Sequence, residues 1–297
     1  MQNNEYKSGF VAILGRPNVG KSTLMNALIG EKVAIVSKKA QTTRNRIMGV
    51  LTGEGFQAVF LDTPGIHKPR TALGTNMMKA VDSALVDTEI LVFVVDVSDI
   101  RAADQEIIDK YSARKAKKLL ILNKIDRVSK EELALAIERF SKYDVQELVP
   151  ISALTGDGVD VVKDLIKKHL PKGPQYFPEN YITDMPERFI VAEMIREKAL
   201  MHLDEEIPHG IGVEIMEIKK APSGVTHIQA TIYCEKNSHK SIIIGKGGSM
   251  IGKIGSAARY EIERLLDGQI NLQLWVKVVP DWRNRASELK NLGYVGD

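Results

Sequence analysis

A short glycine-rich stretch near the start of the chain has residue types and a spacing that suit phosphate binding. The segment GRPNVGKS follows the apolar run FVAIL and places Gly15, Gly20, Lys21 and Ser22 in a G-x-x-x-x-G-K-[ST] pattern. The backbone N–H groups of such a loop surround phosphate oxygens, and the next helix adds the positive end of its dipole. Lys21 is expected to reach the β- and γ-phosphates, and the Ser22 hydroxyl to ligate Mg²⁺. The pattern alone fits adenine and guanine nucleotides equally.

Two later motifs strengthen the prediction of a nucleotide site, and the second of them favours a guanine base. FLDTPG ends an apolar run with Asp62, which can hold magnesium through water, and Gly65 can offer its N–H to the γ-phosphate. LILNKID then places Asn123, Lys124 and Asp126 after another apolar run. The Asp126 carboxylate can accept hydrogen bonds from the N1–H and 2-amino groups of guanine, which adenine lacks. Leaving that carboxylate unpaired would cost adenine about 3 kcal/mol.

A fourth motif, ISAL, completes the set, because the backbone N–H groups of Ser152 and Ala153 can lie near the guanine oxygen. All four motifs follow apolar runs, in this order, so we expect a GTP/GDP site. Residues 9–170 resemble the translation-factor-like branch of P-loop GTPases. The residues expected to bind nucleotide are Gly15, Asn18, Gly20, Lys21, Ser22, Thr23, Asp62, Gly65, Asn123, Lys124, Asp126, Ser152 and Ala153.

The resemblance implies a threonine that closes over magnesium only when GTP is bound. The segment KAQTTRNR offers Thr42 and Thr43, of which we favour Thr43 and keep Thr42 as the alternative. The expected magnesium ligands are therefore Ser22, Thr43 and Asp62.

Hydrolysis is expected to be slow or to depend on another element. Ras-type GTPases place a water-orienting glutamine directly after the glycine of the second motif, where this chain has Ile66. Related GTPases with an apolar residue there bind a potassium ion at the position of Asn18, and we expect the same here. The residues expected to serve catalysis are Lys21, Thr43, Gly65 and Asn18.

A second glycine-lysine loop lies near the end of the chain, in SIIIGKGGSMIGKIG. It lacks the spacing of the first loop but matches I-G-x-x-G-x-x-I, and so resembles the GXXG loop of a KH domain. In that domain two helices meet at a glycine turn that packs against four nucleotides of single-stranded backbone. The interval 236–260 holds five basic residues and no acidic one, although 181–297 holds 15 basic and 16 acidic residues. The expected RNA-binding residues are Gly245, Lys246, Gly247, Gly248, Lys253 and Arg259.

The elements that must position these residues fall into two patterns. Up to residue 170, short β-rich runs alternate with amphipathic stretches, which predicts a P-loop GTPase domain of the α/β class with a mainly parallel sheet. PKGPQYFPEN at 171–180 is the expected linker. After it, the order helix, two strands, two helices and a strand predicts a smaller α+β, type II KH domain over 181–280. A helical tail follows at 281–297, where we expect Trp282 to pack the helix rather than stack on a base.

The composition bounds the remaining function classes. The chain has 297 residues, one cysteine and a formal net charge of +3, so a disulfide framework is excluded and any basic surface must be local. The first ten residues lack the pattern of a signal peptide, and the longest apolar run is too short for a membrane span. We expect a cytoplasmic protein.

The combination of both domains resembles the Era family of bacterial ribosome-assembly GTPases. That resemblance implies binding of 16S ribosomal RNA near its 3′ end, a role in 30S subunit assembly and peripheral association with the cytoplasmic membrane. We also expect a monomer. Two other classes stay open on the residues alone. One is an accessory GTPase for RNA modification, disfavoured because the sequence lacks a cysteine or metal cluster. The other is an adaptor whose KH-like sheet binds a protein or a membrane surface.

Overall fold

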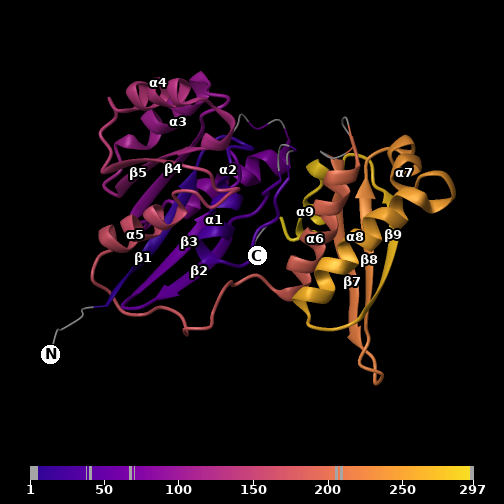
Figure 1. Ribbon diagram of the computed structural model, residues 1–297. Helices are drawn as coiled ribbons and strands as arrows, with labels where there is room; N and C mark the ends of the chain where they lie inside the picture. The colour runs from indigo at the N-terminus through magenta and orange to yellow at the C-terminus, as the bar shows by residue number, and fades with distance from the viewer. Residues whose placement is uncertain are drawn as a thin grey trace. The chain divides into compact units, whose positions relative to one another are not determined.

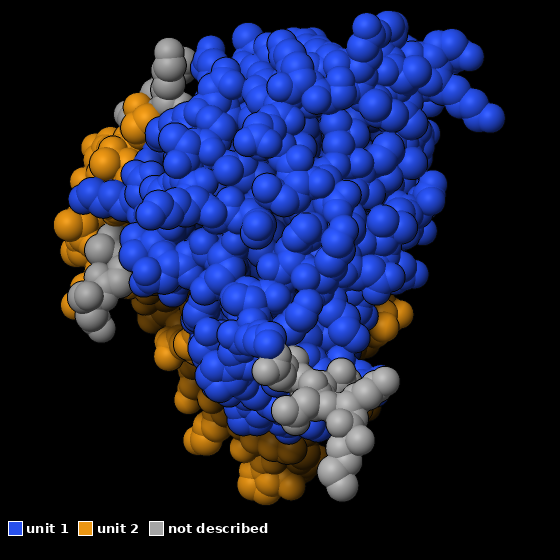
Figure 2. Space-filling model, turned by 90° about the vertical axis from the view of Figure 1, so that its left-hand side faces the viewer, with its two compact units in different colours: residues 1–34, 43–68, 77–184 blue, residues 35–42, 69–76, 185–297 orange. Residues whose placement is uncertain are grey.

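The computed structural model describes residues 6–37, 39, 42–66, 69, 71–204, 207 and 210–294. The chain divides into two compact units, coloured separately in Figure 2. The first unit consists of residues 1–34, 43–68 and 77–184, and the second of residues 35–42, 69–76 and 185–297.

The first unit is built on a six-stranded sheet of order β2-β3-β1-β4-β5-β6. Its strands are β1 (Lys7–Leu14), β2 (Ile47–Gly53), β3 (Phe56–Asp62), β4 (Ile90–Asp96), β5 (Lys117–Asn123) and β6 (Glu147–Ile151). All neighbouring strands pair in parallel except β2, which pairs antiparallel with β3. Because the parallel strands are covered on both faces, β3 and β4 are buried along their whole length.

Helices cover both faces of this sheet (Figure 1). They are α1 (Lys21–Ile29), α2 (Ala72–Ala84), α3 (Ala102–Ser112), α4 (Lys130–Phe140) and α5 (Val159–His169). One core cluster joins Phe93 of β4 and Leu120 of β5 to Ile107 of α3 and Phe140 of α4. Ser129 starts α4 with a capping box, in which its hydroxyl accepts from the N–H of Glu132 at 3.2 Å. Because these strands are parallel, their carboxyl ends lie at the same edge of the sheet.

The sequence patterns did not predict the edge strand β2. The segment that follows α5 and contains the predicted linker is hydrogen-bonded to this strand. The backbone N–H of Val50, on β2, donates to the carbonyl of Ile182 at 2.7 Å. The hydroxyl of Thr183 donates to the carbonyl of Met48 at 2.6 Å. Prolines prevent a helix here but leave an extended chain that can pair with a sheet edge. Residues 171–184 accordingly belong to the first unit.

The second unit contains a three-stranded sheet and a helical layer. Its main elements are α6 (Glu187–His202), β7 (Gly212–Lys220), β8 (Thr226–Cys234), α7 (Asn237–Ile244), α8 (Ser249–Leu265), β9 (Ile270–Val278) and α9 (Ala286–Asn291). The sheet order is β7-β8-β9, with β7 antiparallel and β9 parallel to β8. Ile195 of α6, Ile232 of β8 and Ala258 of α8 share its core. The predicted fold class is confirmed: a mainly parallel α/β domain followed by a smaller α+β domain.

The indole of Trp282 is fully buried, and its Nε1 donates to the carbonyl of Gly210 at 2.9 Å. Its ring centroid lies 6.1 Å from that of Tyr294. The expectation that Trp282 packs the end of the chain is therefore confirmed. Within the described part of the chain, none of the helices has the length and apolar character that crossing a membrane requires.

Candidate nucleotide and nucleic-acid sites

The loop between β1 and α1 is pressed against its surroundings at both of its glycines. Gly15 has φ 153° and Gly20 has φ 103°. A Cβ added at Gly15 would meet the backbone oxygen of Val94 at 2.5 Å, and one at Gly20 would collide with the side chain of Asn123. Only glycine allows this approach, because it has no side chain and tolerates positive φ. The loop is thereby held at the carboxyl ends of the strands.

Lys21 is buried, and its ammonium group lies inside this loop. Its Nζ donates to the carbonyl of Gly15 at 3.2 Å and to that of Arg16 at 3.0 Å. Burial lowers the pKa of Lys21 to about 8, while the nearby Asp62 carboxylate acts in the opposite direction. A phosphate group entering the loop would supply the charge partner that favours the protonated amine.

Three oxygen-bearing side chains meet beside this lysine. The Ser22 hydroxyl donates to Oδ2 of Asp62 at 2.6 Å and lies 2.9 Å from the Thr43 hydroxyl, which is 3.4 Å from the same carboxylate oxygen. The second carboxylate oxygen of Asp62, Oδ1, is buried and lacks a hydrogen-bond partner among the described residues. Burial raises the pKa of Asp62, against the effects of Lys21 and of both hydroxyls. Hydroxyl and carboxylate oxygens are ligands that Mg²⁺ prefers, so these residues fit a magnesium ion.

The two threonine alternatives occupy different places. The hydroxyl of Thr42 donates to the backbone carbonyl of Lys39 at 2.6 Å. Only Thr43 lies beside Ser22 and Asp62, so the geometry favours Thr43 as the magnesium threonine.

Asn123 joins the phosphate loop to the loop after β6. Its Nδ2 donates to the carbonyl of Val19 at 2.8 Å, and its Oδ1 accepts from the N–H of Ala153 at 2.9 Å. The hydroxyl of Ser152 donates to Oδ1 of Asp126 at 2.6 Å. The residues predicted to bind guanine therefore lie close together, and a neighbouring hydroxyl orients the Asp126 carboxylate.

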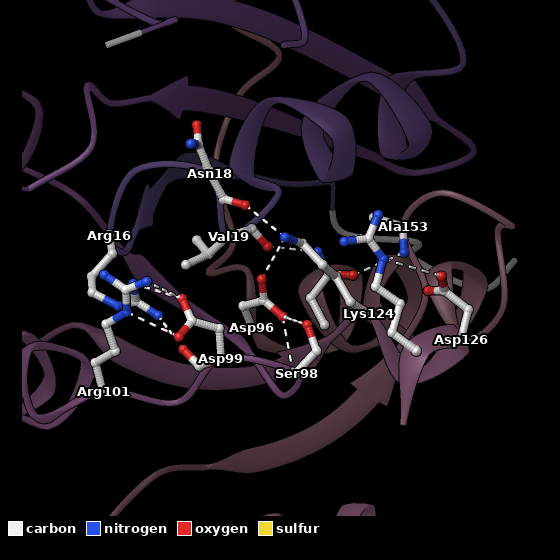
Figure 3. Close-up of polar contacts among 12 residues, drawn as sticks. Arg16, Asn18, Val19, Asp96, Ser98, Asp99, Arg101, Lys124, Asp126 and Ala153 are labelled. Atoms are coloured by element: carbon white, nitrogen blue, oxygen red, sulfur yellow. Dashed lines mark hydrogen bonds and ion pairs between the residues drawn. The ribbon is translucent and has the colours of Figure 1, made fainter. Parts of the chain in front are cut away.

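Lys124 reaches across to the phosphate loop, as Figure 3 shows. Its Nζ donates to the carbonyl of Asn18 at 2.8 Å and forms an ion pair with Asp96 at the end of β4. Asp96 also accepts from the hydroxyl of Ser98 at 2.6 Å. Sequence reasoning missed Asp96, although an acidic residue ending the apolar run ILVFVV was a usable signal.

Ile66 and Asn18 are the two residues that bear on how the attacking water and a monovalent cation could be held. The N–H of Ile66 donates to the carbonyl of Gly15 at 3.1 Å, and its side chain packs against the apolar cluster below α3 and α4. Asn18 has φ 65°, and its carbonyl oxygen points toward Lys124 (Figure 3). The side chain of isoleucine cannot form a hydrogen bond with an attacking water.

The second glycine loop connects α7 to α8 and is open to solvent. Three of its glycines have positive φ, namely Gly245 at 73°, Gly247 at 59° and Gly248 at 82°. A Cβ at Gly245 would meet the backbone nitrogen of Met250 at 2.7 Å, whereas Gly247 and Gly248 face open space. Three of the basic side chains around the loop are exposed, namely Lys246, Lys253 and Arg259. A nucleic-acid backbone could therefore approach the loop closely.

Both halves of the chain match known families. Residues 10–124 match the family described as 50S ribosome-binding GTPase, and residues 206–283 match the KH domain family. GTPase Era of Ruminiclostridium cellulolyticum is 53% identical over 291 residues, which span 97% of this chain and 98% of that protein. GTPase Era of Clostridium perfringens is 48% identical over the same shares.

Two solved structures superimpose on nearly the whole chain. One is the crystal structure of Era in complex with MgGDPNP and nucleotides 1506–1542 of 16S ribosomal RNA, and the other is a variant of Aquifex aeolicus Era bound to GDP and AlF4⁻. Each has a TM-score of 0.93 and 42% identity, and the match covers 98% of this chain and 100% of the other. Identity at this level over both domains leaves one assignment, and the chain belongs to the Era family of GTPases.

Proposed function

We propose that this GTPase binds 16S ribosomal RNA near its 3′ end through the loop at 245–248 and assists assembly of the 30S subunit. The observation that carries the proposal is the exposed glycine turn between α7 and α8, with basic side chains around it. Phosphate contacts of this kind need a turn without side chains that block approach, and positive charge beside it. The Era structure with bound 16S ribosomal RNA, 42% identical to this chain, supports the same partner.

In the proposed nucleotide site, the phosphate loop and Lys21 hold the phosphate chain, and the N–H of Gly65 faces the γ-phosphate. Ser22, Thr43 and Asp62 would hold Mg²⁺, which supplies positive charge to the β- and γ-phosphates when bound. The remaining residues in contact with nucleotide are Gly15, Asn18, Gly20, Thr23, Asn123, Lys124, Asp126, Ser152 and Ala153. Hydrolysis yields GDP and phosphate, and it is slow without a further element because Ile66 cannot orient water.

We assign that further element to a potassium ion near Asn18. A monovalent cation beside the phosphate loop would stabilise the charge that develops between the β- and γ-phosphates, in the way that an arginine finger does in other GTPases.

GTP is proposed to control RNA binding through the segments that contain Thr43 and Gly65. GTP can favour an RNA-binding arrangement only to the extent that it binds this arrangement more tightly than the other. The coupling is reciprocal, so bound RNA strengthens GTP binding by the same factor. Hydrolysis then returns the protein to the state with weak RNA affinity.

A ribosomal partner places the protein in the cytoplasm, and we propose that it acts there as a monomer. Peripheral contact with the inner face of the cytoplasmic membrane is part of the same proposal, with the resemblance to Era proteins as its support. Fluorescence-labelled protein and vesicles of anionic lipid would test that contact in a flotation experiment.

The central test is the affinity of the full chain for an RNA with the 3′ end of 16S ribosomal RNA, in GDP and in a non-hydrolysable GTP analogue. We expect tighter binding with the analogue and an affinity that falls steeply as salt rises. Gly247→Asp places a carboxylate in the loop and should reduce affinity at least about tenfold through charge repulsion.

Gly224→Asp is the matched control for this variant. Gly224 lies in the turn between β7 and β8, has φ 87° and also faces open space. The strain and the added charge are therefore similar in the two variants. Gly224 lies before the amino end of β8, however, whereas the RNA loop follows α7, which comes after the carboxyl end of β8. Equal RNA affinities of the two variants, or a lack of specific RNA binding by the wild-type chain, would remove the proposal and favour the adaptor function.

A further inference from the structure

Arg16 lies in the phosphate loop, but its side chain is directed toward α3. The side chain is largely buried, and the residue is only 8% exposed. Its Nε donates to Oδ1 of Asp104 at 2.8 Å, and its Nη2 donates to the backbone carbonyl of Asp99 at 2.5 Å. Its Nη1 lies 3.6 Å from the Asp99 carboxylate, and Figure 3 shows these two residues facing one another. The three guanidinium nitrogens therefore point toward Asp99, in the segment that joins β4 to α3, and toward Asp104, in the first turn of α3.

Asp104 is buried as well, with 2% of its surface exposed. It belongs to the first turn of α3, and its second oxygen accepts from the N–H of Arg101 at 2.8 Å. One carboxylate oxygen thus caps the helix while the other binds the guanidinium of Arg16. A planar guanidinium held by several acceptors has little freedom to move, which makes this pair a rigid connection between α3 and the phosphate loop.

The backbone of Arg16 contributes directly to the shape of the loop. Its carbonyl oxygen accepts from Nζ of Lys21, next to the carbonyl of Gly15 that accepts from the same amine. The loop acts by aiming N–H groups at phosphate oxygens, so displacement of its first residues would misdirect several donors at once. The side chain of Arg16 is the part of this segment that ties it to a neighbouring helix.

We propose that Arg16 and Asp104 are positioning residues, which hold the phosphate loop in its nucleotide-binding shape without touching the nucleotide. This inference rests on the proposed nucleotide site. The guanidinium cannot serve as a phosphate ligand in this arrangement because its nitrogens face Asp99 and Asp104. Helix α3 thereby supports the loop through a side chain that the proposed phosphate contacts do not use.

Arg16→Met, Arg16→Lys and Asp104→Asn test the pair in the full chain. Methionine keeps an unbranched side chain but removes the charge, and lysine keeps the charge but cannot reach both acceptors at once. Asparagine can keep its oxygen on the N–H of Arg101, while its amide NH₂ would face the guanidinium of Arg16, donor against donor. The matched control is Arg101→Met, since Arg101 also binds Asp99, at 2.7 Å, but its side chain is 63% exposed and bonds Asp99 rather than the phosphate loop.

The measurements are the dissociation rate of a fluorescent GDP and the affinities for GDP and GMP. Arg16→Met and Asp104→Asn should each release GDP about tenfold faster. This is the lower end of the effect on affinity that is typical when a group that orients a binding residue is lost. The double variant should be no worse than the more severe single variant, because both remove one interaction. Arg16→Lys should recover part of the loss. GMP, which lacks the β-phosphate that the loop surrounds, should bind with an affinity changed less than about twofold.

Several results would overturn the inference. GDP release from Arg16→Met that matches release from Arg101→Met would show that the pair does not position the loop. Equal losses of GDP and GMP affinity would indicate a general structural role. If Arg16→Met does not fold, Arg16→Lys and Asp104→Asn carry the same comparison. A wild-type chain that binds neither GDP nor GMP would instead refute the proposed nucleotide site itself.

Discussion

The hydroxyl of Ser152 donates a hydrogen bond to the carboxylate of Asp126 at 2.6 Å, which joins the loop after β6 to the loop after β5. These two loops end neighbouring parallel strands, so the sheet holds donor and acceptor in register. A carboxylate that already accepts from one hydroxyl retains lone pairs for the N1–H and 2-amino groups of guanine. The pair orients the group that we propose selects the base.

Replacing Asp126 with Asn should invert the base preference. The asparagine amide can donate to the 2-oxo group of xanthine, whereas it opposes the 2-amino group of guanine with a donor. We expect GDP affinity to fall by at least about a hundredfold and xanthosine diphosphate to bind better than GDP. Ser152→Ala serves as the comparison, because it should weaken both nucleotides without reversing their order. Competition against a fluorescent nucleotide measures all four affinities, and an unchanged preference in Asp126→Asn would contradict the assignment.

The two neighbouring threonines should differ sharply in their effect on magnesium. Thr43→Ala removes a hydroxyl 2.9 Å from that of Ser22, whereas Thr42→Ala removes one bound to the carbonyl of Lys39. We expect Thr43→Ala to lower the apparent Mg²⁺ affinity of the GTP-bound chain about tenfold, and Thr42→Ala to leave it within about twofold. Hydrolysis measured across a Mg²⁺ titration separates the variants. The reverse order would identify Thr42 as the ligand.

Potassium should accelerate hydrolysis through Asn18. Single-turnover GTP hydrolysis in KCl should exceed the rate in NaCl at equal ionic strength by about tenfold or more, because the larger ion replaces an arginine finger. Asn18→Ala should remove most of that difference while retaining the rate in sodium. Equal turnover of the wild-type chain in both salts would leave Asn18 as a turn residue only.

Gln57 should be a main contributor to the stability of the first unit. Its buried side chain donates to the carbonyl of Phe177 at 2.9 Å and accepts from the N–H groups of Tyr176 and Phe177 at 2.8 and 2.9 Å. Gln57→Leu preserves volume but leaves these backbone groups without a side-chain partner, so the free energy of unfolding should fall by about 2–4 kcal/mol. Urea denaturation followed by circular dichroism measures the change. A loss below about 0.5 kcal/mol would show that water replaces the amide without cost.

The phenol of Tyr233 should make stability fall at high pH. Its hydroxyl donates to Glu214 at 2.5 Å, and burial, this hydrogen bond and the charges of Glu214 and Glu288 raise its pKa. Lys277 lies against its ring, with Nζ 5.4 Å from the centroid. The unfolded chain releases the phenolic proton near pH 10, before the folded chain does, so this contribution is complete below pH ~10 and is lost as pH rises through the folded pKa.

Tyr233→Phe isolates that contribution from the other titrating groups. The stability difference between wild type and Tyr233→Phe should be constant from about pH 7 to 9 and should shrink between about pH 10 and 11. Denaturation at fixed pH values provides the measurement. A difference that stays constant across this range would mean that Tyr233 has an ordinary pKa.

The sequence by itself determined the ligand class and the order of the domains. Each phosphate or base motif is a few residues long, and its chemistry resides in those residue types, so Lys21, Asp126 and the glycines at 245–248 could be named without a structure. Hydrophobic periodicity likewise predicted most strands and helices, since it reports burial directly. The edge strand β2 was not predicted, because its short apolar run is interrupted by Gly49 and ends at Thr52 and Gly53.

The tertiary structure decided every relationship that depends on residues far apart in the chain. It placed Thr43, rather than Thr42, beside Asp62, and it brought Asp96 to Lys124 and Asp104 to Arg16. No local pattern specifies these pairs, because the sequence separation between partners is set by how the strands pair and which helix lies beside them. The side chain of Arg16 shows the difference most clearly: its place in the motif follows from the sequence, whereas its direction toward α3 follows from packing.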